Sequence, residues 1–127
     1  MNFIKYDNEF SKYIRLKYAD ENGICSCYTC GNNYYWKYIQ NGHFFSRAHI
    51  LTRYHENNCR PQCLVCNVQK DGNLEIYKKK LIKEIGKDEF NVLIELKKID
   101  IKIMKYELDE LLIFWRAEIK RMLKVIS

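Results

Sequence analysis

The sequence predicts a single α+β domain, residues 1–127, in which a small metal-stabilised core lies between an N-terminal helix and long C-terminal helices. Two Cys-x-x-Cys pairs, Cys27 with Cys30 and Cys63 with Cys66, enclose a segment rich in aromatic and turn-forming residues. Apolar residues recur at helical spacing before and after that segment. With one proline and no Gly- or Ser-rich linker, nothing marks a boundary between domains.

The predicted helices lie at the two ends of the chain. Within the segment 1–23, apolar spacing predicts a helix from residue 8 to about residue 19. The helical extension, 74–127, keeps this spacing as far as Gly86, which is expected to stop the second helix. From Ile101 to Val125 an apolar stripe predicts a third helix, about 38 Å long. The stripe favours packing against the core, and the alternative is a homodimer formed through these C-terminal helices.

The core segment, 24–73, is expected to contain short strands. Aromatic residues, which favour strands, cluster at 34–36 and at 44–45. Asn41-Gly42 between the clusters predicts a tight turn. The segment therefore predicts a hairpin region.

The composition predicts a basic, folded protein of a reducing cytoplasm. No apolar run approaches the roughly 20 residues of a membrane span, and the first residues do not form a signal peptide, so no membrane partner is expected. A net charge of +6 and a pI of about 9.0 suit a polyanionic partner such as DNA.

The cysteine pairs predict a metal site, because disulfides rarely persist in a reducing compartment whereas metal thiolates do. A gap of two residues lets both sulfurs of a pair reach one ion. One structural Zn²⁺ is therefore expected on four thiolates, those of Cys27, Cys30, Cys63 and Cys66. The spare Cys25 and Cys59 are interpreted as small buried residues, with a larger cluster or a replacement of Cys27 by Cys25 as alternatives. Because four thiolates close the zinc, catalysis would need a second ion.

All three histidines, His43, His49 and His55, lie between the cysteine pairs together with Arg47. Histidine is the side chain best suited to accept a proton near neutral pH. Phosphodiester hydrolysis needs such a base and a cation that neutralises charge on the phosphate. The group therefore suggests a hydrolytic site, and the alternative is that the histidines only decorate a surface hairpin.

Four short runs occur in a characteristic order and spacing along the chain: FSKYIRL at 10–16, CYTCG at 27–31, GHF at 42–44 and QCLVCN at 62–67. Together they resemble the phage lambda NinG (Rap) recombination proteins, and the likeness extends from Phe10 to Gly86. The resemblance implies an HNH-like treble-clef (ββα-metal) fold. It also implies an endonuclease, a phosphodiester hydrolase that cuts branched DNA such as Holliday junctions or D-loops, working in the host cytoplasm if a phage encodes it.

The same resemblance assigns roles by position. His43 matches the first histidine of HNH nucleases and would activate the attacking water. Asn58 matches the central asparagine and would hold the strand and loop that carry His43. Asn67 matches the last position of the motif and would help to bind a catalytic Mg²⁺ or Mn²⁺.

One position departs from the family pattern. Many HNH nucleases have Asp or His directly before the base as a metal ligand, whereas this chain has Gly42. His49 is the tentative replacement, and His55, Glu56 and Asp71 are alternatives. The departure also suggests a second function, that of a non-catalytic, zinc-containing accessory protein that binds branched DNA during recombination.

Basic residues are expected to follow the DNA backbone, where Lys and Arg contacts position a protein with little sequence preference. Arg47 is also expected to clamp the scissile phosphate, because a guanidinium can donate two parallel hydrogen bonds. The predicted DNA contacts are Arg47, Arg53, Arg60, Lys70, Lys78, Lys79 and Lys80.

Overall fold

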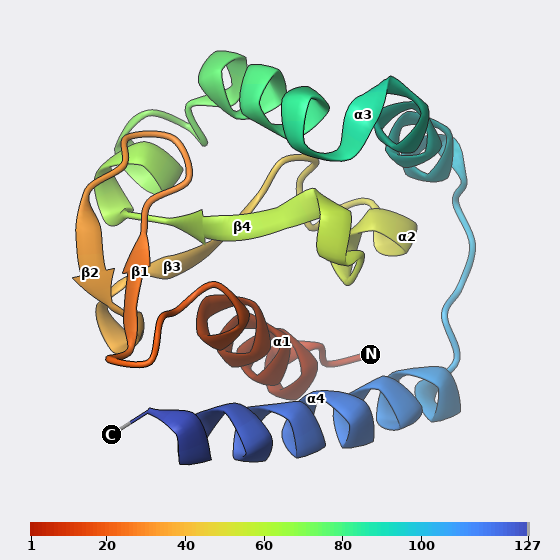
Figure 1. Cartoon of the computed structure of the whole chain (residues 1–127). Helices are drawn as coiled ribbons and strands as arrows, with labels where there is room; N and C mark the ends of the chain where they lie inside the picture. Colours follow the sequence, from red (N-terminus) through yellow and green to blue (C-terminus); the bar gives the residue numbers. More distant parts are fainter. Residues whose placement is uncertain (127) are drawn as a thin grey trace.

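The structure, a computed structural model, describes residues 1–126 and stacks its helices on both sides of a small central sheet (Figure 1). In the middle, strand β3 (Gln40–His43) pairs antiparallel with β4 (Cys59–Gln62). Helix α1 (Ile4–Lys17) lies against one face of this sheet and α3 (Leu74–Lys98) against the other. Helix α4 (Lys105–Val125) packs on the outer side of α1. The expected mixture of helices and a small sheet is confirmed.

A second two-stranded sheet carries the first cysteine pair. Strand β1 (Ile24–Ser26) pairs antiparallel with β2 (Asn33–Tyr35), and Cys27 and Cys30 lie in the loop between them. The other elements are short: helix α2 (Ile50–Arg53), the 3₁₀ turns Trp36–Tyr38 and Glu56–Asn58, and a π-helical turn at Val65–Gln69. Among residues 1–126, no helix combines the length and the apolar character needed to cross a membrane.

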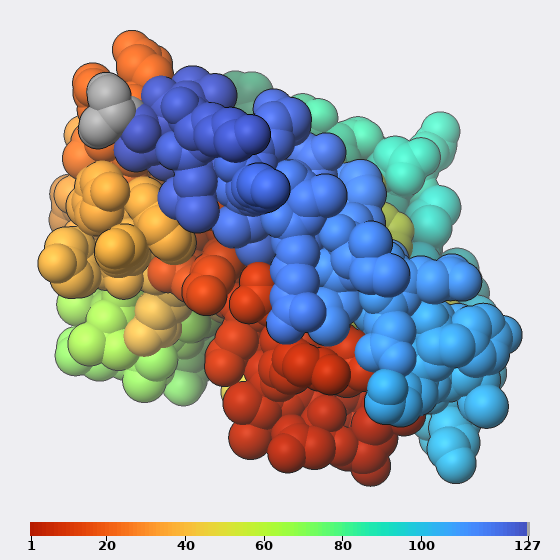
Figure 2. All heavy atoms as spheres, turned by 90° about the horizontal axis from the view of Figure 1, so that it is seen from below, coloured from red at the N-terminus to blue at the C-terminus, as the bar shows by residue number. Residues whose placement is uncertain are grey.

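The main core lies between α1 and α4. Helix α1 begins at Ile4, earlier than predicted, because Tyr6 extends the buried stripe by one turn. Helix α4 buries Leu108, Leu112, Trp115 and Ile119, one face at spacings of four, three and four. The rings of Phe10 and Trp115 lie 4.9 Å apart at their centroids. The interpretation of the stripe as core packing is confirmed, and Figure 2 shows α4 lying across the molecule beside α1.

The C-terminal helix is shorter than predicted. Helix α3 ends at Lys98 and α4 begins at Lys105, so Ile101 and Met104 lie in the connection and are exposed. A homodimer through the C-terminal helices stays a prediction.

Helix α3 bends at Gly86 instead of ending there. This glycine has a φ of 87° and a ψ of 161°, a conformation that residues with a Cβ rarely adopt, and the helix resumes after it. The second half of α3 therefore turns back toward α2 (Figure 1). There Phe90 and Leu93 join Tyr77 and Leu81 in a second small core.

The prediction of a turn at Asn41-Gly42 is wrong, because both residues lie inside β3, opposite Pro61 and Arg60. A Cβ on Gly42 would collide with the carboxamide of buried Gln62. Glycine is thus needed here for a close approach between strands and not for a turn. The same contact explains why position 42 carries no metal-binding side chain.

Gly42→Ala is expected to lower the free energy of unfolding by about 1–3 kcal/mol, the usual cost of overpacking a closed site. Urea denaturation would measure it. Because Gln62 is the group in collision, the same substitution in a Gln62→Ala background should cost less. Equal costs in the two backgrounds would contradict this account of Gly42.

Candidate functional site

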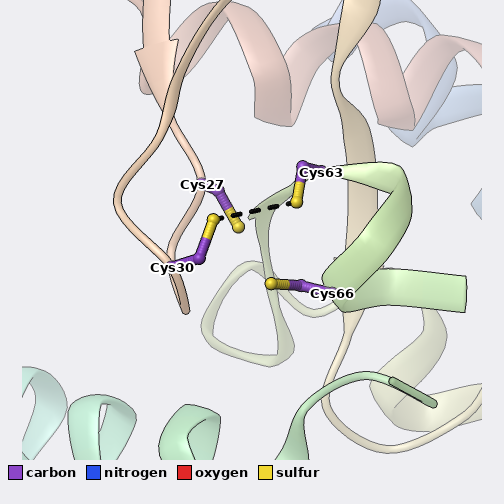
Figure 3. Close-up of side chains that lie close together, drawn as sticks. All are labelled: Cys27, Cys30, Cys63 and Cys66. Carbon is purple, nitrogen blue, oxygen red and sulfur yellow. Dashed lines mark hydrogen bonds between the residues drawn. The ribbon is translucent and has the colours of Figure 1, made fainter. Parts of the chain in front are cut away.

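Four cysteines form a cluster in which the sulfur atoms all lie within 4.8 Å of one another (Figure 3). Cys27 and Cys30 come from the β1–β2 loop, and Cys63 and Cys66 follow β4. The Sγ atoms of Cys30 and Cys63 are 3.8 Å apart. A tetrahedral zinc with Zn–S bonds of about 2.3 Å requires sulfurs about 3.8 Å apart. The four predicted ligands therefore come together in an arrangement that fits a structural metal such as zinc.

The electrostatics of the cluster also suit a cation. Burial raises the pKa of the Cys27 thiol, but hydrogen bonds from the backbone N–H groups of Cys63, Cys30 and Thr29 and from the Thr29 hydroxyl bring it down to about 6. For Cys30 the N–H of Asn32 favours the thiolate, yet burial and the three neighbouring sulfurs raise the pKa to about 12. Four thiolates this close need a cation between them, which zinc would supply.

The two spare cysteines lie outside this cluster. Cys25 is 2% exposed and Cys59 is fully buried in the main core. Burial raises the pKa of the Cys25 thiol to about 11, and it raises that of Cys59 further. Both therefore stay neutral thiols, as expected for small core residues.

A polar cleft of about 670 Å³ lies between α1 and β3. It brings together three residues predicted to act in catalysis, His43, Arg47 and Asn67. The rest of its wall is mostly polar and includes Asp7, Asn8, Ser11 and Arg15 from α1 and Gln40 and Asn41 from β3. This cleft is the candidate active site.

His43 ends β3, and its Nε2 lies 2.9 Å from the backbone carbonyl oxygen of Arg53. A carbonyl can only accept, so Nε2 carries the hydrogen and Nδ1 keeps a free lone pair. Burial, with smaller contributions from the charges of Arg47 and Arg53, lowers the pKa of His43 despite the hydrogen bond and the opposing charge of Asp7. The imidazole is therefore neutral at pH 7, with a basic Nδ1.

Imidazole ¹⁵N NMR should show the Nε2–H tautomer of His43 at neutral pH. Because burial disfavours the charged ring, the proton should bind Nδ1 with a midpoint below the usual value of about 6.5. The neutral, basic form should thus predominate above pH 6.5 and decline as the pH falls through the lowered pKa of His43. An Nδ1–H tautomer, or a midpoint above 6.5, would contradict this description.

Asp7 binds the side chain of Arg53, the residue whose backbone carbonyl accepts the hydrogen bond from His43. Its carboxylate accepts hydrogen bonds from Arg53 Nε at 3.0 Å, Arg53 Nη2 at 2.6 Å and the Tyr54 hydroxyl at 2.6 Å. Burial would raise the pKa of Asp7, but these hydrogen bonds and the nearby arginines lower it overall, so the group is an anion. Asp7 thereby fixes the end of α2 to α1. Sequence reasoning missed it, because it belongs to no motif and precedes the region of resemblance.

Asn58 does not line the cleft and is fully buried. Its Oδ1 accepts from the N–H of Phe45 at 2.8 Å, and its Nδ2 donates to the carbonyls of Phe45 and Thr52 at 3.0 Å each. These hydrogen bonds tie the loop after His43 to the start of β4. Asn58 thus holds the loop, and its importance for catalysis stays a prediction.

Asn67 directly follows the last cysteine of the cluster, in the π-helical turn. Its backbone N–H donates to the carbonyl of Cys63 at 2.9 Å. Its side-chain Nδ2 donates to Gln40 Oε1 at 2.8 Å, which leaves Oδ1 as the atom that suits a cation. The cysteine cluster therefore sets the place of Asn67 in the cleft.

Other predicted residues lie elsewhere. His49 does not line the cleft of His43 and instead faces a second pocket. Arg60 is 1% exposed and pairs with Glu84 at 2.8 Å, a placement that does not present it to DNA. The Arg53 guanidinium is held by Asp7. The sequence alone does not reveal such internal ion pairs. The other predicted DNA contacts are exposed, as binding to DNA requires: Lys70, Lys78, Lys79 and Lys80.

A comparison with models of protein families finds a match to the bacteriophage lambda NinG protein over residues 2–125. Searches of curated proteins and of solved structures found no match. The family match includes α1, both cysteine pairs, the cleft and all of α4. The chain therefore belongs to the bacteriophage lambda NinG protein family.

Proposed function

We propose that this protein is a metal-dependent endonuclease that nicks branched DNA recombination intermediates, such as Holliday junctions or D-loops. The proposal includes an HNH-like treble-clef core, formed by the cysteine cluster, the β3–β4 pair and the turn that follows β4. One observation carries it: a neutral histidine with a fixed Nε2 and a basic Nδ1 lies in one cleft with Asn67 and Arg47. Membership of the NinG family supports the link to recombination.

In the proposed reaction, His43 Nδ1 takes a proton from a water molecule while the water oxygen attacks the phosphorus. The phosphorus–oxygen bond to the leaving strand then breaks, and a proton from solvent neutralises the leaving oxygen. Arg47, with a side chain 61% exposed at the rim of the cleft, would donate hydrogen bonds to the phosphate oxygens. These roles require a base and a phosphate clamp in one cleft, and His43 and Arg47 both line it.

A Mg²⁺ or Mn²⁺ ion would neutralise charge on the phosphate and the leaving oxygen. Such hard ions prefer oxygen ligands and keep several waters. Asn67 Oδ1 fits this preference, and Asp7 is the one carboxylate among the described residues that line the cleft. The phosphate itself and water would complete the coordination.

The second candidate is a non-catalytic protein that binds branched DNA. It is favoured by the state of Asp7, whose oxygens already accept hydrogen bonds from Arg53 and Tyr54. It is also favoured by Gly42, where the close approach of Gln62 leaves no room for a ligand. Under this hypothesis the cleft would bind phosphate without cutting it.

The test uses a four-way junction, a D-loop and a linear duplex of matched sequence, each labelled on one strand, with Mg²⁺ or Mn²⁺. The endonuclease proposal predicts nicks in the branched substrates and few in the linear duplex. Retardation of the junction without any nick would support the accessory-protein hypothesis. Equal cleavage of all three DNAs would contradict structure selectivity.

A further inference from the structure

A second pocket, of about 430 Å³, lies where the kinked half of α3 faces the loop after β3. Phe44, Phe45, Phe90 and Ile94 give it an apolar surface, and Lys78, Lys97 and Lys98 are its basic residues. We propose that this aromatic pocket holds one unpaired base of the DNA substrate by stacking. The inference rests on the proposed function, since it takes DNA as the ligand.

The rings of the pocket form a stacking surface. The centroids of Phe44 and Phe45 lie 4.8 Å apart, and those of Phe45 and Phe90 lie 6.4 Å apart. Phe44 and Phe45 are only partly buried, so the packing of the small core leaves part of their surface open to the pocket. Every base has a π face, so stacking on such rings is strong and tolerant of sequence.

The charges around the rings favour a ligand that carries phosphate. Three lysines and His49 line the pocket, and none of its described lining residues is acidic. Lys97 Nζ lies 4.9 Å from the centroid of Phe45, and Lys78 Nζ lies 6.0 Å from that of Phe90. Neither lysine makes an ion pair within residues 1–126. A base can replace these ammonium groups on the rings while they move to the adjacent phosphates.

The pocket requires an unpaired base. A base inside a duplex has both faces covered by its neighbours, and a concave pocket can take it only after it leaves the stack. Branch points and displaced strands offer such bases at little cost. The pocket would thus read the feature that distinguishes a junction from a linear duplex.

The pocket and the cleft are joined by the backbone. Phe44 and Phe45 directly follow His43, and Asn58 holds both the N–H and the carbonyl of Phe45. A base stacked on Phe45 would therefore be held a few atoms of rigid chain away from the catalytic histidine. Gly86 matters as well, because its kink turns Phe90 and Lys97 back toward this loop.

The test compares two duplexes of one sequence, one fully paired and one with a short bulge that contains 2-aminopurine. Fluorescence anisotropy gives the affinities, and quenching of 2-aminopurine reports stacking. Wild-type protein should prefer the bulge by about 5- to 150-fold, the range of one stacked base. Phe45→Leu, which keeps an apolar side chain but removes the π face, should abolish the quenching and most of the preference while duplex affinity persists. Phe45→Trp should retain both.

Phe114→Leu is the matched control, since Phe114 is a half-exposed aromatic residue of α4 that packs on Tyr13, away from the pocket. Circular dichroism and zinc content confirm the fold of each variant. Wild-type protein that binds duplex without preferring the bulge would overturn the pocket alone, as would an unchanged preference in Phe45→Leu. Failure to bind any DNA would overturn the proposed function and the pocket with it.

Discussion

Cys63→Ser protein is expected to lose its zinc and the packed structure of its centre. Cys63 lies between β4 and the π-helical turn, and its sulfur sits 3.8 Å from that of Cys30 in the β1–β2 loop. A metal on the four cysteines would therefore join the β1–β2 loop to the turn after β4, adding to the hydrogen bonds that link Tyr28 to Pro61 and Thr29 to Gln62. A structural zinc contributes on the order of 10 kcal/mol or more, comparable to the whole stability of a small domain. Zinc analysis and near-ultraviolet circular dichroism would measure the loss.

Cys59→Ala is the matched control, because Cys59 is also buried but lies outside the cluster. It should keep one zinc per chain and unfold cooperatively, at a cost of about 1 kcal/mol for the small cavity. Cys27→Ser should behave like Cys63→Ser. If Cys63→Ser retained one zinc and a native spectrum, the assignment of the four ligands would be wrong.

His43→Ala is expected to slow nicking of the four-way junction by about 10²- to 10⁴-fold, the usual contribution of a general base. The chemical step should slow while binding is kept, since among residues 1–126 the ring makes a single hydrogen bond, to the carbonyl of Arg53, and its lowered pKa favours the neutral form at neutral pH. The affinity for the junction should therefore stay close to that of the wild type. Single-turnover nicking and gel retardation on the same preparations would separate the two effects.

His55→Ala provides the comparison. His55 accepts a hydrogen bond from the N–H of Asn57 and does not line the cleft. Its loss should leave the nicking rate nearly unchanged. A His43→Ala protein that nicks as fast as the His55→Ala protein would rule out His43 as the base.

The features that sequence predicted well depend on local patterns. The spacing of Phe10 and Leu112 with their neighbours defines the buried faces of α1 and α4. The gap of two residues in each cysteine pair is the spacing that lets both sulfurs bind one metal ion, so the cluster could be predicted from the sequence. His43 and Asn67 could be singled out because the family resemblance assigns them by position, and Arg47 because a guanidinium suits a phosphate; all three line one cleft.

The features that sequence did not predict depend on contacts between distant residues. Asn41-Gly42 has the composition of a turn, but the side chain of Gln62 makes it the middle of a strand. In the sequence Arg60 is one of many basic residues, but its buried guanidinium pairs with Glu84, 24 positions later, and donates to the carbonyls of Glu56 and Cys59. Asp7 gains its role only when α1 lies beside α2. In each case a partner far away in the sequence decides which structure or role the residue adopts.

The proposed function gives the two ions different roles: the zinc would build the site, and a second, weaker ion would take part in the chemistry. The direct test is to remove weakly bound ions from the zinc-loaded protein and to follow junction nicking, zinc content and circular dichroism together. We expect a folded protein with one zinc per chain that does not nick until Mg²⁺ or Mn²⁺ is added, and a His43→Ala protein that stays inactive after the addition. Nicking by the zinc-loaded protein without an added ion, or no nicking after Mg²⁺ or Mn²⁺ is added, would contradict these separate roles for the two ions.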